Sequence, residues 1–142
     1  MPTITYRSLA GYKYGLMEPY AHETGVTLDA AVASRQGWVK MGRSGRLTTK
    51  KGYAWDGPSG PTIDSKNFMR GSLVHDALYQ LMREKLLPQH TRKRADQLLH
   101  DICRQDGMSK ARSDYVYHAV RVFGGSFAKP PRKPKKVRIT AP

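Results

Sequence analysis

The hydrophobic and polar positions of this chain follow two patterns, which change near residue 65. Residues 1–65 contain short segments rich in Thr, Tyr and Val, separated by glycines and polar clusters. Segments of this kind are typical of short β-strands. The sequence HETGVTLDAAVA, at 22–33, fits either a short helix or a loop with a strand. We expect strands within 3–9, 13–18, 37–42 and 46–55, with a hairpin turn at 43–45 between the last two.

From residue 66 onwards the apolar residues recur largely at spacings of three and four, which is the period of an amphipathic helix. The first helix is expected to begin near Asn67 and to end before Pro88. Thr91 is the expected N-cap of a second helix and Ser109 that of a third. The third helix carries the apolar residues Tyr115, Val116, Ala119, Val120 and Phe123. Because the connections are short, we expect the first two helices to lie antiparallel, in an α+β fold.

The length and composition fit one domain followed by a tail. The chain has 142 residues, of which 39% are apolar, enough for one modest core. We expect a single α+β domain over residues 1–128, strand-rich over 1–65 and helical over 66–128. The one cysteine, Cys103, excludes an intramolecular disulfide, and we interpret it as a buried thiol.

The basic charge of the chain is spread over both the domain and the tail. There are 25 Lys and Arg against 11 Asp and Glu, a formal charge of +14, which favours an anionic partner. The tail, residues 129–142, has four prolines and no acidic residue, so a packed helix or strand is not expected there. We expect its six basic residues to bind a partner or an anion: Lys129, Arg132, Lys133, Lys135, Lys136 and Arg138.

One stretch, GYAWDGPSGPTIDSKNFMRGSLVHDALYQLM at 52–82, carries candidate chemistry. On a helix His75, Asp76 and Tyr79 can line one side. The Gly- and Pro-rich loop upstream, 55–61, can turn carbonyl oxygens towards a common point. Carbonyls and a carboxylate are ligands that Ca²⁺ accepts, and Asp76 can supply the carboxylate.

With Asp76 on the metal, His75 is free to take a proton from water, as a general base. Its imidazole would then need a carboxylate on the other nitrogen, and Asp96 on the next helix is the best-placed one. A structural alternative stays open, in which His75 is a satisfied packing residue. The same holds for Asp56, which is either a turn residue or a metal ligand. Trp55 is interpreted as a packing residue rather than a lipid anchor.

This arrangement resembles the phospholipase A2 superfamily, which joins a glycine-rich calcium loop to an HDxxY helix and an aspartate on the antiparallel helix. Here HDALY, at 75–79, matches HDxxY, and the compact, disulfide-free form in parvovirus capsid proteins is the nearest likeness. The resemblance implies a phospholipase A2-like core. It makes His75 the general base, Asp76 the calcium ligand, Tyr79 a supporting hydroxyl and Asp96 the imidazole partner. It also implies metal-binding backbone oxygens near Trp55, Gly57 and Gly60.

The chain also resembles, over nearly its whole length, an uncharacterised family encoded by tailed phages and prophages. The motifs that carry this likeness are KGYAWDGPSGPTID, SLVHDALYQLMR and RADQLL. The resemblance implies a phage origin and names no activity. The sequence departs from the phospholipase pattern, because WDGPSGP replaces the usual Gly-x-Gly run and places Asp56 inside the loop.

Two classes of function follow. The first is a phage-encoded, virion-associated, calcium-dependent phospholipase A2-like ester hydrolase that acts on host membrane lipid during entry or lysis. The second is a non-catalytic tail or tail-tip component that keeps the fold as a scaffold and docks on other virion proteins through its basic surface and tail. In either case we expect it in the virion or the host cytoplasm, without a signal peptide or membrane span. Scattered histidines make zinc a weaker interpretation, and sequence-specific DNA binding is not expected.

Overall fold

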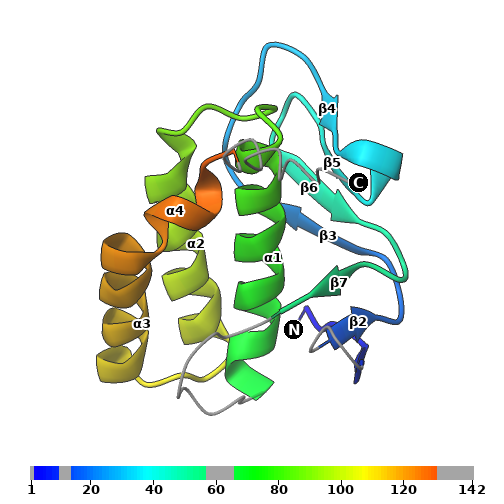
Figure 1. Cartoon of the computed structure of the whole chain (residues 1–142). Helices are drawn as coiled ribbons and strands as arrows, with labels where there is room; N and C mark the ends of the chain where they lie inside the picture. The colour runs from blue at the N-terminus through cyan, green and yellow to red at the C-terminus, as the bar shows by residue number, and fades with distance from the viewer. Residues whose placement is uncertain (1, 10–13, 57–65, 131–142) are drawn as a thin grey trace, which may run out of the picture.

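The computed structural model describes residues 2–9, 14–56 and 66–130 of the chain. Short strands come first and helices follow, so the predicted α+β class is confirmed. In Figure 1 helix α1 lies between the strands on one side and helices α2 and α3 on the other. Its bounds are Lys66–Arg83, and most of its residues are buried, which makes α1 the centre of the molecule.

The described strands form two antiparallel sheets. The first has the order β1-β2-β7, with bounds Tyr6–Ser8, Tyr14–Leu16 and Ala54–Trp55. The second has the order β3-β6-β5-β4, with bounds Tyr20–Glu23, Arg46–Thr49, Val39–Met41 and Val32–Ala33. A 3-10 turn, Arg35–Gly37, lies between β4 and β5. The ambiguous segment at 22–33 therefore contains the end of β3, a loop and the whole of β4.

The segment predicted as one strand over 46–55 belongs to both sheets. It is divided between β6 and β7 because Gly52 has a φ of +92°, a conformation that glycine adopts without a steric penalty. The Gly52 amide donates to the carbonyl of Leu16 at 2.7 Å, and the Leu16 amide donates to the carbonyl of Tyr53 at 2.8 Å. The predicted hairpin turn before β6 is confirmed, with Gly45 at a φ of +95° and its amide 3.0 Å from the carbonyl of Gly42.

The helical half follows the predicted spacing closely. Helix α2 is Thr91–Gln105 and α3 is Lys110–Phe123, followed by a short helix α4, Gly125–Ala128, that the sequence pattern did not indicate. Ser109 caps α3 as predicted, because its hydroxyl accepts from the amide of Arg112 at 3.2 Å. The prediction for Thr91 is wrong: it is the first residue of α2, its side chain is buried, and its amide already closes a turn on Pro88.

Helices α1 and α2 pack antiparallel, as predicted. Arg70 near the start of α1 reaches the end of α2, where its Nε donates to Asp106 at 3.0 Å, while its Nη1 donates to the hydroxyl of Tyr20 on β3 at 2.9 Å. This buried guanidinium therefore joins both helices to a strand. Cys103 on α2 is free and buried, as expected, and burial raises its pKa to about 12.

A histidine joins α2 to α3 at the surface. His100 on α2 lies with Nε2 2.7 Å from Asp114 on α3 and with Nδ1 3.1 Å from Asp101. Hydrogen bonds to Asp101 and Asp114 hold the pKa of His100 above its usual value, although partial burial opposes this. Protonated His100 thus bridges two carboxylates on two helices.

The His100 bridge should make stability depend on pH. Because the pKa is higher in the folded than in the unfolded state, the contribution is complete below the unfolded value of about 6.5 and is lost as pH rises through the folded pKa. The melting temperature of wild type should therefore fall relative to that of His100→Gln as the pH rises from about 6.5 through the raised pKa of His100. His118→Gln, which changes an exposed histidine of α3, is the control and should follow wild type.

Two adjacent glycines at the junction of α3 and α4 should differ in their response to substitution. A side chain at Gly124 should destabilise the fold, whereas one at Gly125 should not. A Cβ at Gly124 would lie 2.5 Å from the carbonyl oxygen of Val120 and 2.9 Å from the Tyr79 hydroxyl, whereas a Cβ at Gly125 first meets Arg92 at 3.5 Å. Gly124→Ala should lower the free energy of unfolding by about 1–3 kcal/mol. Gly125→Ala should be neutral or stabilise by up to about 1 kcal/mol. Urea denaturation measures both, and equal effects would contradict this packing.

Candidate functional site

The centre of the site is a buried histidine–aspartate pair. His75 on α1 and Asp96 on α2 lie with Nε2 and Oδ1 2.7 Å apart, and the Asp96 side chain has no exposed surface. Since an ionised carboxylate only accepts hydrogen bonds, Nε2 carries the proton. In neutral His75 this leaves Nδ1 unprotonated and able to accept a proton.

Asp96 receives two further donors, one from each neighbouring helix. The Tyr79 hydroxyl donates to Oδ1 at 2.6 Å, and Nη1 of Arg121, on α3, donates to Oδ2 at 2.9 Å. Burial alone would raise the pKa of Asp96, but the hydrogen bonds from His75, Tyr79 and Arg121 outweigh it and hold the pKa below its usual range. Asp96 is therefore a permanent carboxylate at neutral pH.

Arg92 connects this network to the end of α3. Its Nε donates to the Tyr79 hydroxyl at 3.1 Å, and its Nη2 donates to the carbonyls of Val120 and Arg121 at 2.6 and 2.7 Å. These carbonyls belong to the last turn of α3, where that of Val120 also accepts from the amide of Gly124 at 2.9 Å. The position of α3 is thus fixed by the same cluster that surrounds Asp96.

The second nitrogen of His75 faces Asp76. Nδ1 lies 3.7 Å from Oδ1 of Asp76, whose side chain is 31% exposed. Burial lowers the pKa of His75, but the carboxylates of Asp76 and Asp96 outweigh it, so the net shift is upward. Burial raises the pKa of Asp76, an effect to which Asp56 adds and which His75 partly offsets. The base form of His75 therefore prevails only above a raised pKa.

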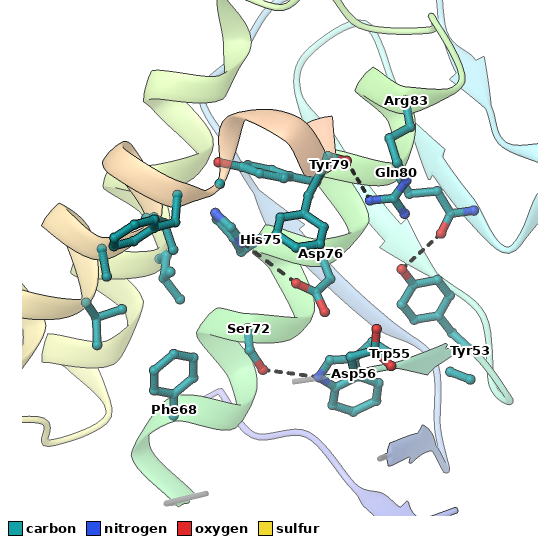
Figure 2. A pocket seen from close by; sticks show the side chains of 18 of the residues that line it. Tyr53, Trp55, Asp56, Phe68, Ser72, His75, Asp76, Tyr79, Gln80 and Arg83 are labelled. Atoms are coloured by element: carbon teal, nitrogen blue, oxygen red, sulfur yellow. Dashed lines mark hydrogen bonds and ion pairs between the residues drawn. The ribbon is translucent and has the colours of Figure 1, made fainter. Parts of the chain in front are cut away.

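His75 and Asp76 open into a cavity of about 520 Å³ with one polar and one apolar side (Figure 2). Figure 2 shows the polar side, where the Tyr53 hydroxyl donates to Gln80 at 3.1 Å and the indole of Trp55 donates to Ser72 at 3.1 Å. The apolar side is formed by α1, α2 and α3 with residues that include Phe68, Leu99, Val116, Val120 and Phe123. The cavity thus presents polar and apolar surfaces side by side.

Two of the side chains that line the cavity carry oxygen donors that suit a hard cation. Asp56 and Asp76 both line it, and carboxylates are the ligands that Ca²⁺ prefers. Nearby carboxylates also disfavour each other's charge, a repulsion that a divalent cation relieves. Among the described residues, no group of three or more His, Cys, Asp or Glu side chains is arranged as a metal site. The predicted ligands Gly57 and Gly60 lie outside the described residues.

The other predicted residues fall into two sets. The Trp55 side chain is 2% exposed and packs in the core, as interpreted from the sequence. Lys129 is exposed directly after α4. The remaining predicted tail residues lie outside the described part of the chain: Arg132, Lys133, Lys135, Lys136 and Arg138. No helix in the described ranges has the length and apolar character needed to cross a membrane.

The fold and site define an α+β protein whose buried histidine–aspartate pair opens into a partly apolar cavity. Residues 37–120, more than half of the chain, match a family described as "Protein of unknown function (DUF1353)", and the chain belongs to this family. The match includes His75, Asp76, Tyr79 and Asp96. No curated protein and no solved structure matches the chain. Membership of a family without an assigned activity is thus confirmed, while the phage origin and the kinship with phospholipase A2 stay predictions.

Sequence reasoning missed both arginines of the site. Arg92 and Asp96 are four residues apart on α2, with Nε and Oδ2 at 3.9 Å, so their spacing was a readable signal. Arg121 is 25 residues from Asp96, and only the packing of α3 brings them together. No local pattern could have shown that second pair.

Removing the arginine from the buried carboxylate should cost far more than breaking an exposed ion pair. Arg121→Met should lower the free energy of unfolding by about 1.5–3 kcal/mol, because Asp96 stays buried with one charged donor fewer. The control is Arg46→Met. Arg46 lies 2.8 Å from Glu23, and the two side chains are 61% and 62% exposed. That change should cost less than about 1 kcal/mol. Guanidinium denaturation compares them, and similar losses would contradict the role of Arg121.

Proposed function

We propose that this protein is a calcium-dependent, phospholipase A2-like ester hydrolase that acts on membrane lipid. One observation carries the proposal: Asp96 fixes Nε2 of His75, while Nδ1 is directed to a cavity with an apolar wall. A base in this position beside an apolar binding surface suits water-dependent cleavage of an ester with a long acyl chain. The HDxxY spacing of His75, Asp76 and Tyr79 supports the same chemistry.

Each residue of the site has its own role in the proposed ester hydrolysis. Neutral His75 takes a proton from water at Nδ1, and the water oxygen attacks the ester carbonyl. The imidazolium formed in this step is stabilised by Asp96, which stays ionised. Tyr79 and Arg121 satisfy the remaining acceptor sites of that carboxylate, so the imidazole keeps its orientation. The proton on His75 is then available to the leaving alkoxide.

The proposed metal ligands are the carboxylates of Asp76 and Asp56. When bound, Ca²⁺ supplies positive charge that polarises the ester carbonyl and stabilises its developing negative charge. Asp76 adjoins His75 in the chain, so a cation held by its carboxylate is close to the base. The metal would also remove the repulsion between Asp76 and Asp56.

The apolar side of the cavity supports an acyl ester as substrate. Phe68, Leu99 and Val116 give one side of the cavity an apolar surface that suits an alkyl chain. Arg83 lines the same cavity, and a guanidinium is suited to a phosphate group. The phage origin, the virion or host-cytoplasm location and the association with other virion proteins rest on the sequence resemblance alone.

Calcium and histidine variants test this proposal. Ca²⁺ should stabilise wild type by about 2.7 kcal/mol at a hundredfold excess over its dissociation constant, and Asp76→Asn should reduce that stabilisation. His75→Ala should keep the calcium response and lose about 10²–10⁴-fold in ester hydrolysis. His118→Ala, on the exposed side of α3, is the matched control. Thermal melts and fatty-acid release from a phospholipid measure the two effects.

The proposal fails if folded wild type neither gains stability from Ca²⁺ nor releases product. The buried pair would then be part of the core, and the alternative, a non-catalytic tail or tail-tip component, would be favoured.

A further inference from the structure

Large apolar side chains are exposed mainly on one part of the described surface. Within the described ranges, five such residues are well exposed, and four of them lie on α3 and α4: Tyr115 at 65%, Val122 at 71%, Phe123 at 75% and Phe127 at 61%. We call these four residues the α3–α4 rim. The fifth is Met17, at 37%, which follows β2. A cluster of this kind marks a binding surface more often than scattered single residues do.

The rim borders the mouth of the cavity. Tyr115 and Phe123 are eight residues apart on α3, with Ala119 midway, so the three share one side of the helix. All three line the cavity, and Phe127 of α4 does so too. These aromatic rings therefore continue the apolar wall of the cavity out to the solvent. A ligand that fills the wall and extends outwards would meet the rim next.

Positive charge accompanies the rim. Nη1 of Arg83 donates to the carbonyl of Phe127 at 3.0 Å, and Lys129 is exposed two residues further on. From Lys129 to the end of the chain the sequence contains six basic residues and no acidic one. The surface that is most apolar is thus joined to the most basic part of the chain.

An anionic lipid bilayer fits both properties. Aromatic side chains are favoured at the level of the headgroups, where their rings contact acyl chains. Clusters of Lys and Arg beside such residues bind anionic headgroups, and the combination of two weak signals gives stable attachment. A second copy of the chain fits less well, since each copy carries a formal charge of +14 and would place like charges at the contact.

We propose that the α3–α4 rim is the surface by which the protein docks on an anionic membrane, with the mouth of the cavity facing the lipid. This inference builds on the proposed lipid hydrolase, because it gives the substrate a direct route from the bilayer to His75. Docking itself requires neither the metal nor the base.

Vesicle sedimentation tests the docking surface. Wild type, in the presence of a chelator, is mixed with vesicles of equal parts phosphatidylglycerol and phosphatidylcholine, and with vesicles of phosphatidylcholine alone. Wild type should prefer the anionic vesicles, and Phe123→Ser combined with Phe127→Ser should weaken that binding by about tenfold or more. Val122→Ser, which changes a rim residue that does not line the cavity, should weaken it by a smaller factor. Met17→Ser is the matched control and should bind as wild type does.

Three outcomes would overturn the inference. Folded wild type would fail to bind anionic vesicles; or the Phe123 and Phe127 variant, with an unchanged melting temperature, would bind as wild type does. In the third, wild type would be a dimer that does not bind vesicles, and the rim substitutions would dissociate this dimer. The rim would then be the contact with a second copy of the chain.

A water-soluble short-chain ester separates this inference from the hydrolase. If wild type cleaves that ester but does not bind vesicles, the docking proposal alone is overturned. Vesicle binding that depends on the rim, without any ester cleavage, would support docking and refute the hydrolase.

Discussion

The buried carboxylate of Asp96 is the constraint on which the helical half of this protein depends. A charge without solvent exposure costs several kcal/mol unless donors surround it. Its donors come from two other helices: His75 and Tyr79 from α1, and Arg121 from α3. These three helices can therefore pack around Asp96 only in an arrangement that brings all of the donors to it.

The same contacts prepare the cavity. Because Asp96 occupies Nε2 of His75, the imidazole presents its other nitrogen to the cavity beside Asp76. The ring of Tyr79 lies 4.1 Å from that of His75, measured between centroids, and restricts how the imidazole can turn. Arg92 fixes the last turn of α3, which supplies part of the apolar wall. The base and the binding surface are thus positioned by one network.

The features of the fold and the site that depend on nearby residues in the sequence could be predicted. The spacing of HDALY and the antiparallel pairing of two helices were sufficient to place His75 near Asp96, and Ser109 was a readable helix cap. The division of the last predicted strand could not be predicted, since it depends on which sheet accepts the residues after Gly52. Periodicity also marks the apolar side of α3 without showing what covers it, so the exposure of Phe123 appears only in three dimensions.

The most direct test of the central claim is the protonation state of the two nitrogens of His75. With ¹⁵N-labelled histidine and Asp96→Asn to assign the signal, long-range ¹H–¹⁵N NMR spectra distinguish the two tautomers of a neutral imidazole. At a pH above its raised pKa, His75 should carry its proton on Nε2 and leave Nδ1 unprotonated. A proton on Nδ1 with a bare Nε2 would contradict the account, because His75 could then neither donate to Asp96 nor act as a base towards the cavity.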